Sequence, residues 1–456
     1  MRHGEWEGRT VLVLGLGDTG LSCVRWLAAR GARVRGADTR AAPPALGAVR
    51  AAVPGIRVDL GPFDAALLAG VDAVAASPGI ALAEPVLRDA AARGIEIVGD
   101  VEIFGREIAR SAPGARVIGI TGTNGKSTVT ALAGAMASAA GLRTVVAGNI
   151  GLPVLDALAD AQARGHPDCY VIELSSYQLE TTESLALASA AMLNLTQDHL
   201  DRHGSMAGYA RAKARIFRQC GTRVLNRDDP WSLGMAGGRT VTFGLGAPRA
   251  PGEWGLADGE LREGGERIVA LDEVPVAGLH NAANALAAHA LCRSAGMAAE
   301  PLARAIRAFK GLPHRVALVA QARGVAFYDD SKGTNVGATV AALAGLKETV
   351  VLIAGGDGKG QDFAALAPAV KAKARAAVLI GRDGPAIEAV LSGSGVDCVR
   401  AATMDAAVEA AFARARPGDA VLLSPACASL DMFANYRQRG EAFTAAARAL
   451  AKRVEG

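Results

Sequence analysis

The sequence predicts an α/β protein of three domains, in which two doubly wound units flank a central nucleotide-binding unit. At 456 residues, the chain is too long to fold around one ordinary core. Short apolar runs alternate with alanine-rich, helix-like stretches, a pattern typical of parallel sheets with helices on both faces. Glycine-rich loops follow several of these runs, at the sheet edge where such folds bind ligands.

Composition narrows the classes of function. Hydrophobic residues make up 50% of the chain and charged residues 21%, as expected for a soluble globular protein. The net charge of +4 comes without a basic tract, so nucleic acid is not an expected partner. Six scattered cysteines without a Cys-x-x-Cys pair favour reduced thiols in the cytoplasm. The charged N-terminus and the lack of a long apolar run predict neither a signal peptide nor a membrane span.

The N-terminal domain, residues 1–103, opens with a dinucleotide-binding pattern. A predicted strand at Thr10–Leu14 leads into a glycine-rich loop, Gly15–Gly20, and a helix at Leu21–Arg30. The next strand, Arg33–Ala37, ends at Asp38, where an acidic side chain can bind a ribose. These residues predict a Rossmann-like domain, and other ligands with a diphosphate could use the same crevice.

Two further strands are predicted in this domain, at Ala73–Ala76 and Glu96–Val98. The first leads into Ser77-Pro78-Gly79, which could be a simple turn. Its place at the carboxyl end of a strand favours a ligand contact for Ser77.

The central domain, residues 104–311, begins with a phosphate-binding loop of the P-loop ATPase type. Residues 119–128 read Gly-Ile-Thr-Gly-Thr-Asn-Gly-Lys-Ser-Thr between an apolar run and a helix-like stretch, Val129–Met136. Backbone N–H groups of such a turn bind phosphate, Lys126 can reach the outer phosphates, and Ser127 can bind Mg²⁺. The usual pattern has a glycine where this chain has Ile120, and Gly122 supplies the extra glycine instead. A glycine-rich turn without a ligand is the weaker alternative.

The rest of the central domain predicts a largely parallel sheet followed by a small antiparallel meander at Arg239–Val276. Helices are predicted at Ala282–Arg293 and Pro301–Phe309. The predicted strands are Thr144–Ala147, Cys169–Glu173, Ala190–Leu193 and Arg223–Asn226.

Four polar side chains in the central domain need a choice between a structural and a functional interpretation. Glu173 leaves a strand beside the phosphate loop, where it could bind Mg²⁺ or cap a helix. His199 and His203 lack the further ligands of a zinc site, so His199 is better explained as a ligand of a second metal or as a substrate contact. From its local pattern, Lys213 is a solvated helix lysine.

The C-terminal domain, residues 312–456, predicts a second Rossmann-like unit. Three loops follow its strands and carry polar residues: Asp329–Asn335, Gly355–Gly360 and Ser424–Ser429. Each could be only a tight turn, but together at one sheet edge they favour a pocket for an anionic substrate. The predicted strands are Val325–Tyr328, Thr349–Ile353, Ala376–Ile380 and Ala420–Leu423.

Taken in order, these motifs resemble the Mur ligases, and among them the members that add D-glutamate. The resemblance spans essentially the whole chain. Its motifs are Gly122–Ser127, Gly148–Gly151, Glu173–Leu179, Asp198–His203, His280–Asn284, Leu312–Arg315, Asp330–Asn335, Gly355–Lys359 and Leu423–Gly440. At Tyr436 the family pattern leads us to expect Phe, so the extra hydroxyl needs a partner or water.

The resemblance implies an ATP- and Mg²⁺-dependent cytoplasmic ligase, acting as a monomer, that joins D-glutamate to UDP-N-acetylmuramoyl-L-alanine through an acyl phosphate. The ATP contacts it implies are Gly122, Thr123, Asn124, Gly125, Lys126, Ser127, Thr128, Asn284, Arg315 and Asp330. The UDP-substrate contacts it implies are Asp18, Thr19, Asp38, Thr39, Arg40, Ser77, Asn149 and His199. The D-glutamate contacts it implies are Lys332, Thr334, Lys359, Ser429, Leu430 and Tyr436.

Catalysis is expected from Lys126, Glu173, His199 and Lys213. The resemblance implies two Mg²⁺ ions, one held by Ser127 and Glu173 and the other by His199 and a carbamate on Lys213. Carbamylation by CO₂ would turn a cation into an oxygen ligand that suits Mg²⁺.

Three other readings compete with this one. A folylpolyglutamate synthase shares the central loop but would lack the Gly15–Gly20 domain. Mur ligases that add a diamino acid typically carry Asp-Asn-Pro-Arg, which this chain does not contain. An NAD-dependent oxidoreductase fused to an ATPase would also explain the first two domains, and bound NADH fluorescence would reveal it.

Overall fold

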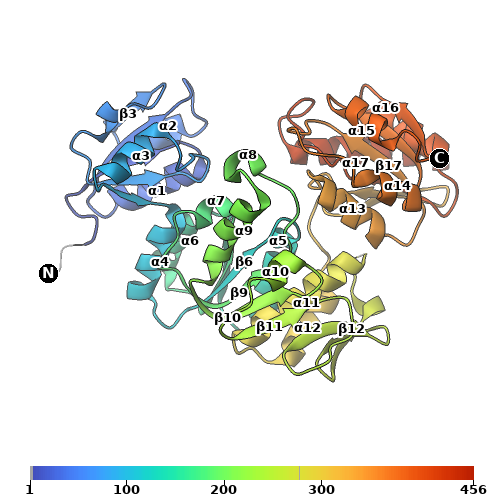
Figure 1. Ribbon diagram of the computed structural model, residues 1–456, viewed down its shortest axis with the longest axis horizontal. Helices are drawn as coiled ribbons and strands as arrows, with labels where there is room; N and C mark the ends of the chain where they lie inside the picture. Colours follow the sequence, from blue (N-terminus) through green and yellow to red (C-terminus); the bar gives the residue numbers. More distant parts are fainter. Residues whose placement is uncertain (1–3, 277) are drawn as a thin grey trace.

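The computed structural model describes residues 4–276 and 278–456 and contains three sheets, one in each third of the chain. Figure 1 shows the N-terminal part in blue and the C-terminal part in red on opposite sides of the central part. The mixed, predominantly parallel α/β class predicted from the sequence is confirmed.

The N-terminal domain is a five-stranded parallel sheet in the order β3-β2-β1-β4-β5, which matches the first five strands of the doubly wound fold. The central strand β1 is apolar after Thr10, and its last four residues are buried. The strands are β1 (Thr10–Leu14), β2 (Arg33–Asp38), β3 (Arg57–Leu60), β4 (Ala73–Ala76) and β5 (Glu96–Val98). The helices are α1 (Asp18–Ala28), α2 (Leu46–Ala52), η1 (Ala65–Leu68), α3 (Pro85–Ala92) and α4 (Asp100–Ser111).

The central domain contains a nine-stranded sheet in the order β14-β13-β12-β11-β10-β9-β6-β8-β7. Its strands are β6 (Arg116–Thr121), β7 (Thr144–Gly148), β8 (Cys169–Glu173), β9 (Ala186–Met192), β10 (Gln219–Asn226), β11 (Thr240–Phe243), β12 (Glu253–Ala257), β13 (Glu260–Glu263) and β14 (Glu266–Ala270). Its helices are α5 (Lys126–Ala139), α6 (Val154–Arg164), α7 (Ser176–Leu179), α8 (Leu200–His203), α9 (Met206–Ala214), η2 (Arg215–Phe217), α10 (Pro230–Leu233), η3 (Leu271–Glu273), α11 (Leu279–Ser294) and α12 (Ala299–Ala308).

The predicted antiparallel meander at Arg239–Val276 is partly wrong. Strand β11 runs parallel to β10, and β12 runs parallel to β11, so only β12, β13 and β14 are antiparallel. These strands also extend the main sheet. The turns Asp258-Gly259 and Gly264-Gly265 supply the hairpins, which is the local signal that suggested a separate meander.

The C-terminal domain has a six-stranded sheet in the order β15-β16-β20-β17-β18-β19. All neighbouring strands are parallel except β15 and β16, so the prediction of a purely doubly wound unit missed one antiparallel edge. The strands are β15 (Ala317–Ala322), β16 (Val325–Asp329), β17 (Val350–Gly355), β18 (Ala374–Ile380), β19 (Asp397–Arg400) and β20 (Ala420–Leu423). The helices are α13 (Val336–Gly345), α14 (Leu366–Lys373), α15 (Gly384–Leu391), α16 (Met404–Arg414) and α17 (Tyr436–Glu455).

Helices connect the three domains. Helix α4 follows the first sheet and packs on α6 of the central domain as well as on α1. Helix α11 of the central domain packs against α13 of the C-terminal domain. Within the described residues, none of the helices combines the length and the apolar character needed to cross a membrane.

Candidate active site

A glycine-rich loop leaves the carboxyl end of β6 and enters α5, as the sequence predicts. Gly125 adopts φ +82° directly before the helix, and Gly122 adopts φ +151°, where a Cβ atom would lie 3.0 Å from Leu193. Both positions therefore favour glycine for a physical reason. Helix α5 is held in place by its buried residues Val129, Leu132 and Met136. The backbone N–H groups of its first turn are thus presented at a fixed site for an anion.

Lys126 folds back over this loop. Its Nζ donates hydrogen bonds to the carbonyl oxygens of Gly122 at 3.0 Å and Thr123 at 2.7 Å. Burial lowers the pKa of Lys126, and the carboxylate of Glu173 opposes that effect. Because this ammonium group lies at the first turn of a helix, where a phosphate would bind, it can exchange its two carbonyl contacts for a contact with the phosphate.

Glu173 lies beside the loop because β8 is the neighbour of β6, with Glu173 opposite Ile120 in the register. The side chain is 2% exposed. Oε1 accepts a hydrogen bond from Asn149 Nδ2 at 2.8 Å, whereas Oε2 is buried and has no hydrogen-bond partner among the described residues. A buried carboxylate oxygen without a partner is costly, and a hard cation such as Mg²⁺ would satisfy it.

Lys213 is buried, so the interpretation of this residue as a solvated helix lysine is wrong. The side chain is 1% exposed. Its Nζ donates hydrogen bonds to the Gly122 carbonyl at 2.7 Å and to Thr121 Oγ1 at 3.2 Å, directly behind the phosphate loop. Burial, reinforced by the nearby Lys126 ammonium, holds the pKa of Lys213 well below its usual range.

His199 stands at the start of α8 with φ +54°, an uncommon conformation for a residue other than glycine. Its Nδ1 lies 2.8 Å from the Tyr177 hydroxyl, and its Nε2 lies 3.6 Å from Asp198 Oδ2. Burial lowers the pKa of His199, with Asp198 opposing the shift and Lys213 adding to it. The ring is therefore neutral at pH 7 and can act as a ligand.

His203, the other histidine of this segment, is placed differently. It stacks on Tyr209 with ring centroids 5.2 Å apart and pairs with Ser176 Oγ at 3.0 Å. Its side chain is only 4% exposed. His203 therefore has a structural role beside the site. Since Ser176 and Tyr209 engage its ring, His203 does not act with His199 as a pair of zinc ligands.

The C-terminal domain contacts the phosphate loop directly. Arg315 Nη2 donates to Ser127 Oγ at 2.6 Å. Asn335 and Asn124 exchange hydrogen bonds through their side-chain amides, at 3.1 and 3.3 Å. Burial raises the pKa of Asp330 to about 7, although a hydrogen bond from Ser424 and the charge of Arg315 oppose the shift. Residues from both domains thus converge on the loop that is expected to hold the phosphates.

Asn284, a further expected ATP contact, lies at the opening of the loop. A Cβ atom at Gly125 would lie 2.6 Å from Asn284 Oδ1, which shows how closely α11 approaches the turn. The Asn284 amide also donates to Asn281 Oδ1 at 3.1 Å.

Six of the eight residues expected to bind the UDP substrate lie at the carboxyl edge of the first sheet, whereas Asn149 and His199 lie in the central domain beside Glu173 and α8. Asp38 accepts hydrogen bonds from the Leu16 backbone at 2.7 Å and from Arg40, whose guanidinium is the main reason the pKa of Asp38 falls to about 2. The Ser77 hydroxyl donates to the Gly15 carbonyl at 2.7 Å, so it also braces the glycine-rich loop. Exposed Asp18 and Thr39 lie at the same edge, and Thr19 is half-buried in α1.

The expected D-glutamate contacts are only partly brought together. Lys332 Nζ lies 3.8 Å from the centre of the Tyr436 ring, and the Tyr436 hydroxyl finds a partner in Arg437 Nε at 3.3 Å. Lys359 is exposed on the loop after β17 with φ +50°. Three further positions are expected to contact D-glutamate. Ser429 is buried and Leu430 is 67% exposed, whereas Thr334 lies beside Lys332.

Three residues that support this site were not singled out from the sequence. Arg439 is buried and donates to Ser331 and to the Cys427 carbonyl, joining two of the predicted loops. Asn335 reaches Asn124, and Tyr177 reaches His199, as described above. Arg439 stands between Gln438 and Gly440 in a polar stretch, so its local sequence gives no sign of burial, and the other two contacts likewise depend on the tertiary fold.

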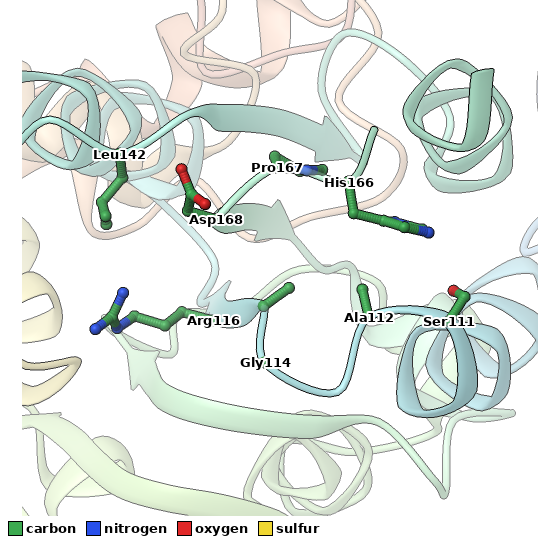
Figure 2. Close-up of a pocket in the computed structure, with 9 residues that line it drawn as sticks. Ser111, Ala112, Gly114, Arg116, Leu142, His166, Pro167 and Asp168 are labelled. Atoms are coloured by element: carbon green, nitrogen blue, oxygen red, sulfur yellow. The ribbon is translucent and has the colours of Figure 1, made fainter. Parts of the chain in front are cut away.

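A separate cavity of about 360 Å³ lies far from these residues, at the opposite edge of the central sheet. Figure 2 shows Arg116 and Asp168 lining it where β6 and β8 begin. Because the glycine-rich loop and Glu173 lie where the same strands end, this cavity is not part of the candidate site.

Comparison with protein families assigns each sheet to a known domain type. Residues 9–99 match the model described as "Mur ligase MurD-like, N-terminal domain", residues 120–292 match "Mur ligase middle domain", and residues 314–427 match "Mur ligase, glutamate ligase domain". Together these matches cover most of the chain.

Similar proteins extend over the full length. The chain is 56% identical to a UDP-N-acetylmuramoylalanine–D-glutamate ligase of Methylobacillus flagellatus, covering 98% of both sequences. It is 55% identical to the ligase of the same name from Thiobacillus denitrificans, covering 98% of this chain and 97% of that protein. A crystal structure of the UDP-N-acetylmuramate-alanine ligase of Thermotoga maritima shares the fold, with 19% identity, a TM-score of 0.60 and coverage of 97% and 99%.

Proposed function

The chain belongs to the Mur ligase family, and we propose that it joins D-glutamate to UDP-N-acetylmuramoyl-L-alanine, with cleavage of ATP, during synthesis of peptidoglycan precursors. The observation that carries this proposal is the meeting of Lys126, Glu173 and Lys213 around a phosphate loop in a chain with full-length relatives of that activity. The oxidoreductase and folylpolyglutamate synthase alternatives do not fit these relatives.

We assign one substrate to each domain. The UDP moiety would lie at the carboxyl edge of the first sheet, residues 1–103, with Asp18, Thr39 and Arg40 at its phosphates and base. ATP would lie on the loop of the central domain, residues 104–311. D-Glutamate would bind the loops of residues 312–456, where the ammonium groups of Lys332 and Lys359 suit its two carboxylates.

In the first step, the terminal carboxylate of the UDP substrate attacks the γ-phosphorus of ATP, which gives an acyl phosphate and ADP. Lys126 moves from its contacts with the Gly122 and Thr123 carbonyls onto the phosphates and offsets the negative charge that develops there. Arg315, now on Ser127, lies close enough to contact the same phosphates.

In the second step, the amine of D-glutamate attacks the acyl carbon and phosphate leaves. The product is an amide, and the amine loses a proton. The loops of the C-terminal domain contribute mainly by holding the nucleophile near the carbonyl, which converts a bimolecular reaction into one within a complex.

The residues around Glu173 fit Mg²⁺, since Oε2 is buried without a hydrogen-bond partner among the described residues and Ser127 offers a hydroxyl in the first turn of α5. Bound there, Mg²⁺ would neutralise part of the phosphate charge. We also propose a second ion near His199 and a carbamate on Lys213. We further propose that the enzyme acts as a monomer in the cytoplasm, where its proposed substrates ATP and a UDP-sugar would be available.

Phosphate release tests the proposal. We expect ATP-dependent release of phosphate that requires both D-glutamate and UDP-N-acetylmuramoyl-L-alanine, with formation of the amide product checked by mass spectrometry. Turnover with neither substrate, or with a diamino acid in place of D-glutamate, would contradict the proposed activity.

We expect strong discrimination between the enantiomers of glutamate. If Lys332 and Lys359 fix both carboxylates, L-glutamate directs its amine away from the acyl carbon, and a misplacement of this kind lowers the rate by about 100-fold or more. Initial rates with each enantiomer at matched concentrations measure the effect. Equal rates would mean that the two lysines do not anchor the amino acid.

A further inference from the structure

Tyr177 makes a contact that the proposed chemistry has not yet used. It lies in the segment after Glu173 and is held in α7, a short helix with a capping box between Ser175 and Gln178. Its hydroxyl lies 2.8 Å from His199 Nδ1, which is its only hydrogen-bond partner within the described part of the chain. The rings of Tyr177 and His199 are 5.0 Å apart, with an angle of 59° between their planes.

Two side chains pack near the Tyr177 ring. The Arg202 guanidinium lies over it at 4.8 Å and donates hydrogen bonds to Glu180 and to the Ile80 carbonyl of the first domain. The centre of the His203 ring is 5.7 Å from that of Tyr177. The hydroxyl therefore has a fixed position, and the ring does not depend on the hydroxyl for its packing.

A hydrogen bond at one nitrogen of an imidazole decides what the other nitrogen can do. A neutral histidine carries one proton, and the group that pairs with Nδ1 sets the orientation of the ring and limits the choice of tautomer. In this site the other nitrogen, Nε2, faces Asp198 Oδ2 at 3.6 Å. His199 also adopts φ +54°, so its backbone is constrained in addition to its side chain.

We propose that Tyr177 is a positioning residue, whose hydroxyl occupies Nδ1 of His199 and leaves Nε2 as the nitrogen that meets the substrate complex. The proposal rests on the function proposed above. When Nε2 binds a cation through its lone pair, the ring proton is on Nδ1, and the Tyr177 oxygen accepts it. Loss of the hydroxyl frees the ring to rotate and to populate both tautomers.

The decisive variant is Tyr177→Phe, because it removes only the hydroxyl and keeps the ring that packs near Arg202 and His203. A matched control exists in β8, the strand that precedes α7. The Tyr170 hydroxyl lies 3.2 Å from His166 Nδ1, a second tyrosine–histidine pair near the start of β8 and away from the candidate site. Tyr170→Phe removes an equivalent hydrogen bond without touching His199.

The first measurement uses the ligand-free protein. We expect the ¹⁵N shifts of the His199 ring to report one predominant tautomer in the wild type and a mixture in Tyr177→Phe, with the wild-type pattern retained in Tyr170→Phe. Identical His199 shifts in the wild type and Tyr177→Phe would overturn the proposal. This readout does not depend on turnover, so it separates the proposal from the assignment of the enzyme's function.

The second measurement is kinetic. We expect Tyr177→Phe to raise the Mg²⁺ concentration needed for half-maximal rate, or to lower kcat, by about 10-fold, with the KM for D-glutamate unchanged. Tyr170→Phe should match the wild type in both respects. Unchanged kcat and Mg²⁺ dependence in Tyr177→Phe would also overturn the proposal. Failure of the proposed function itself would instead appear as an inactive wild type.

Discussion

Lys126→Ala is expected to abolish turnover while leaving the fold intact. In the ligand-free protein the Lys126 ammonium group donates hydrogen bonds to the Gly122 and Thr123 carbonyls, which belong to the loop itself, so we expect the fold to survive the loss of this side chain. In the reaction, however, its charge would oppose the negative charge that builds on the transferred phosphoryl group. Removing one preorganised electrostatic contact of this kind typically lowers kcat by about 10³-fold, or roughly 4 kcal/mol.

The measurement is phosphate release at saturating ATP and substrates, with circular dichroism and thermal melting to confirm folding. Lys371→Ala is a suitable control, because Lys371 is exposed on α14 and belongs to no expected site. A Lys126→Ala enzyme that keeps most of its kcat would show that the loop does not bind the transferred phosphate.

The elements that the sequence predicted well are those with a strong local signal. Strands such as β1, β8 and β20 are almost wholly buried apolar runs bounded by turns, and the phosphate loop carries glycines at positions with positive φ. The family motifs also predicted the order of the three domains. The comparisons confirm that order, because three Mur ligase domain models match the chain one after another.

The missed elements are edge strands. β3 (Arg57–Leu60) and β19 (Asp397–Arg400) have four residues each and contain charged residues, because one side of each strand lacks a neighbour and their faces are partly exposed. These two sequences therefore lack the apolar run of a central strand. β15 (Ala317–Ala322) carries no charge and is mostly apolar, but it is an edge strand that pairs antiparallel with β16, a pairing that its local sequence does not reveal. The parallel direction of β11 was missed for a different reason. Local sequence determines neither which strand β11 pairs with nor the direction of that pairing.

The site could be predicted only where function and local pattern coincide. The contact between Asn124 and Asn335 joins positions 211 residues apart, so no window of sequence contains it. The unpartnered oxygen of Glu173 is likewise visible only once β6, β7 and β8 are side by side. The sequence allowed Glu173 to be either a metal ligand or a helix cap. In the structure Ser175 caps the helix that follows, α7, so the metal-ligand interpretation of Glu173 is favoured.

Lys213 shows the largest gap between local pattern and structure. It lies on the alanine-rich helix α9, where a lysine normally extends into water. Its burial comes from the phosphate loop, whose Gly122 carbonyl accepts its hydrogen bond from 91 residues away in the chain. Burial holds the pKa of Lys213 well below its usual range and so favours the neutral amine, and only a neutral amine has the lone pair that reacts with CO₂.

Carbamylation of Lys213 forms an N–C bond between the amine and CO₂ and releases one proton, giving an anionic oxygen donor. That group would lie beside the phosphate loop, where a cation bound with ATP needs oxygen ligands. Lys213→Ala and Lys213→Met are therefore both expected to lose about 10³-fold or more in kcat. Met retains most of the buried volume, so an equal loss in the two variants separates chemistry from packing.

Two further measurements complete this test. Acetate or another short carboxylate added to Lys213→Ala should restore part of the activity by entering the space that the side chain leaves, but should have no effect on the wild type or on Lys126→Ala. Equilibration of the wild type with ¹³C-bicarbonate should give a carbamate signal in the ¹³C spectrum that is absent from Lys213→Met. If the Lys213→Met enzyme is active and the wild type gives no carbamate signal, Lys213 is a buried structural lysine whose role is to hold the Gly122 carbonyl.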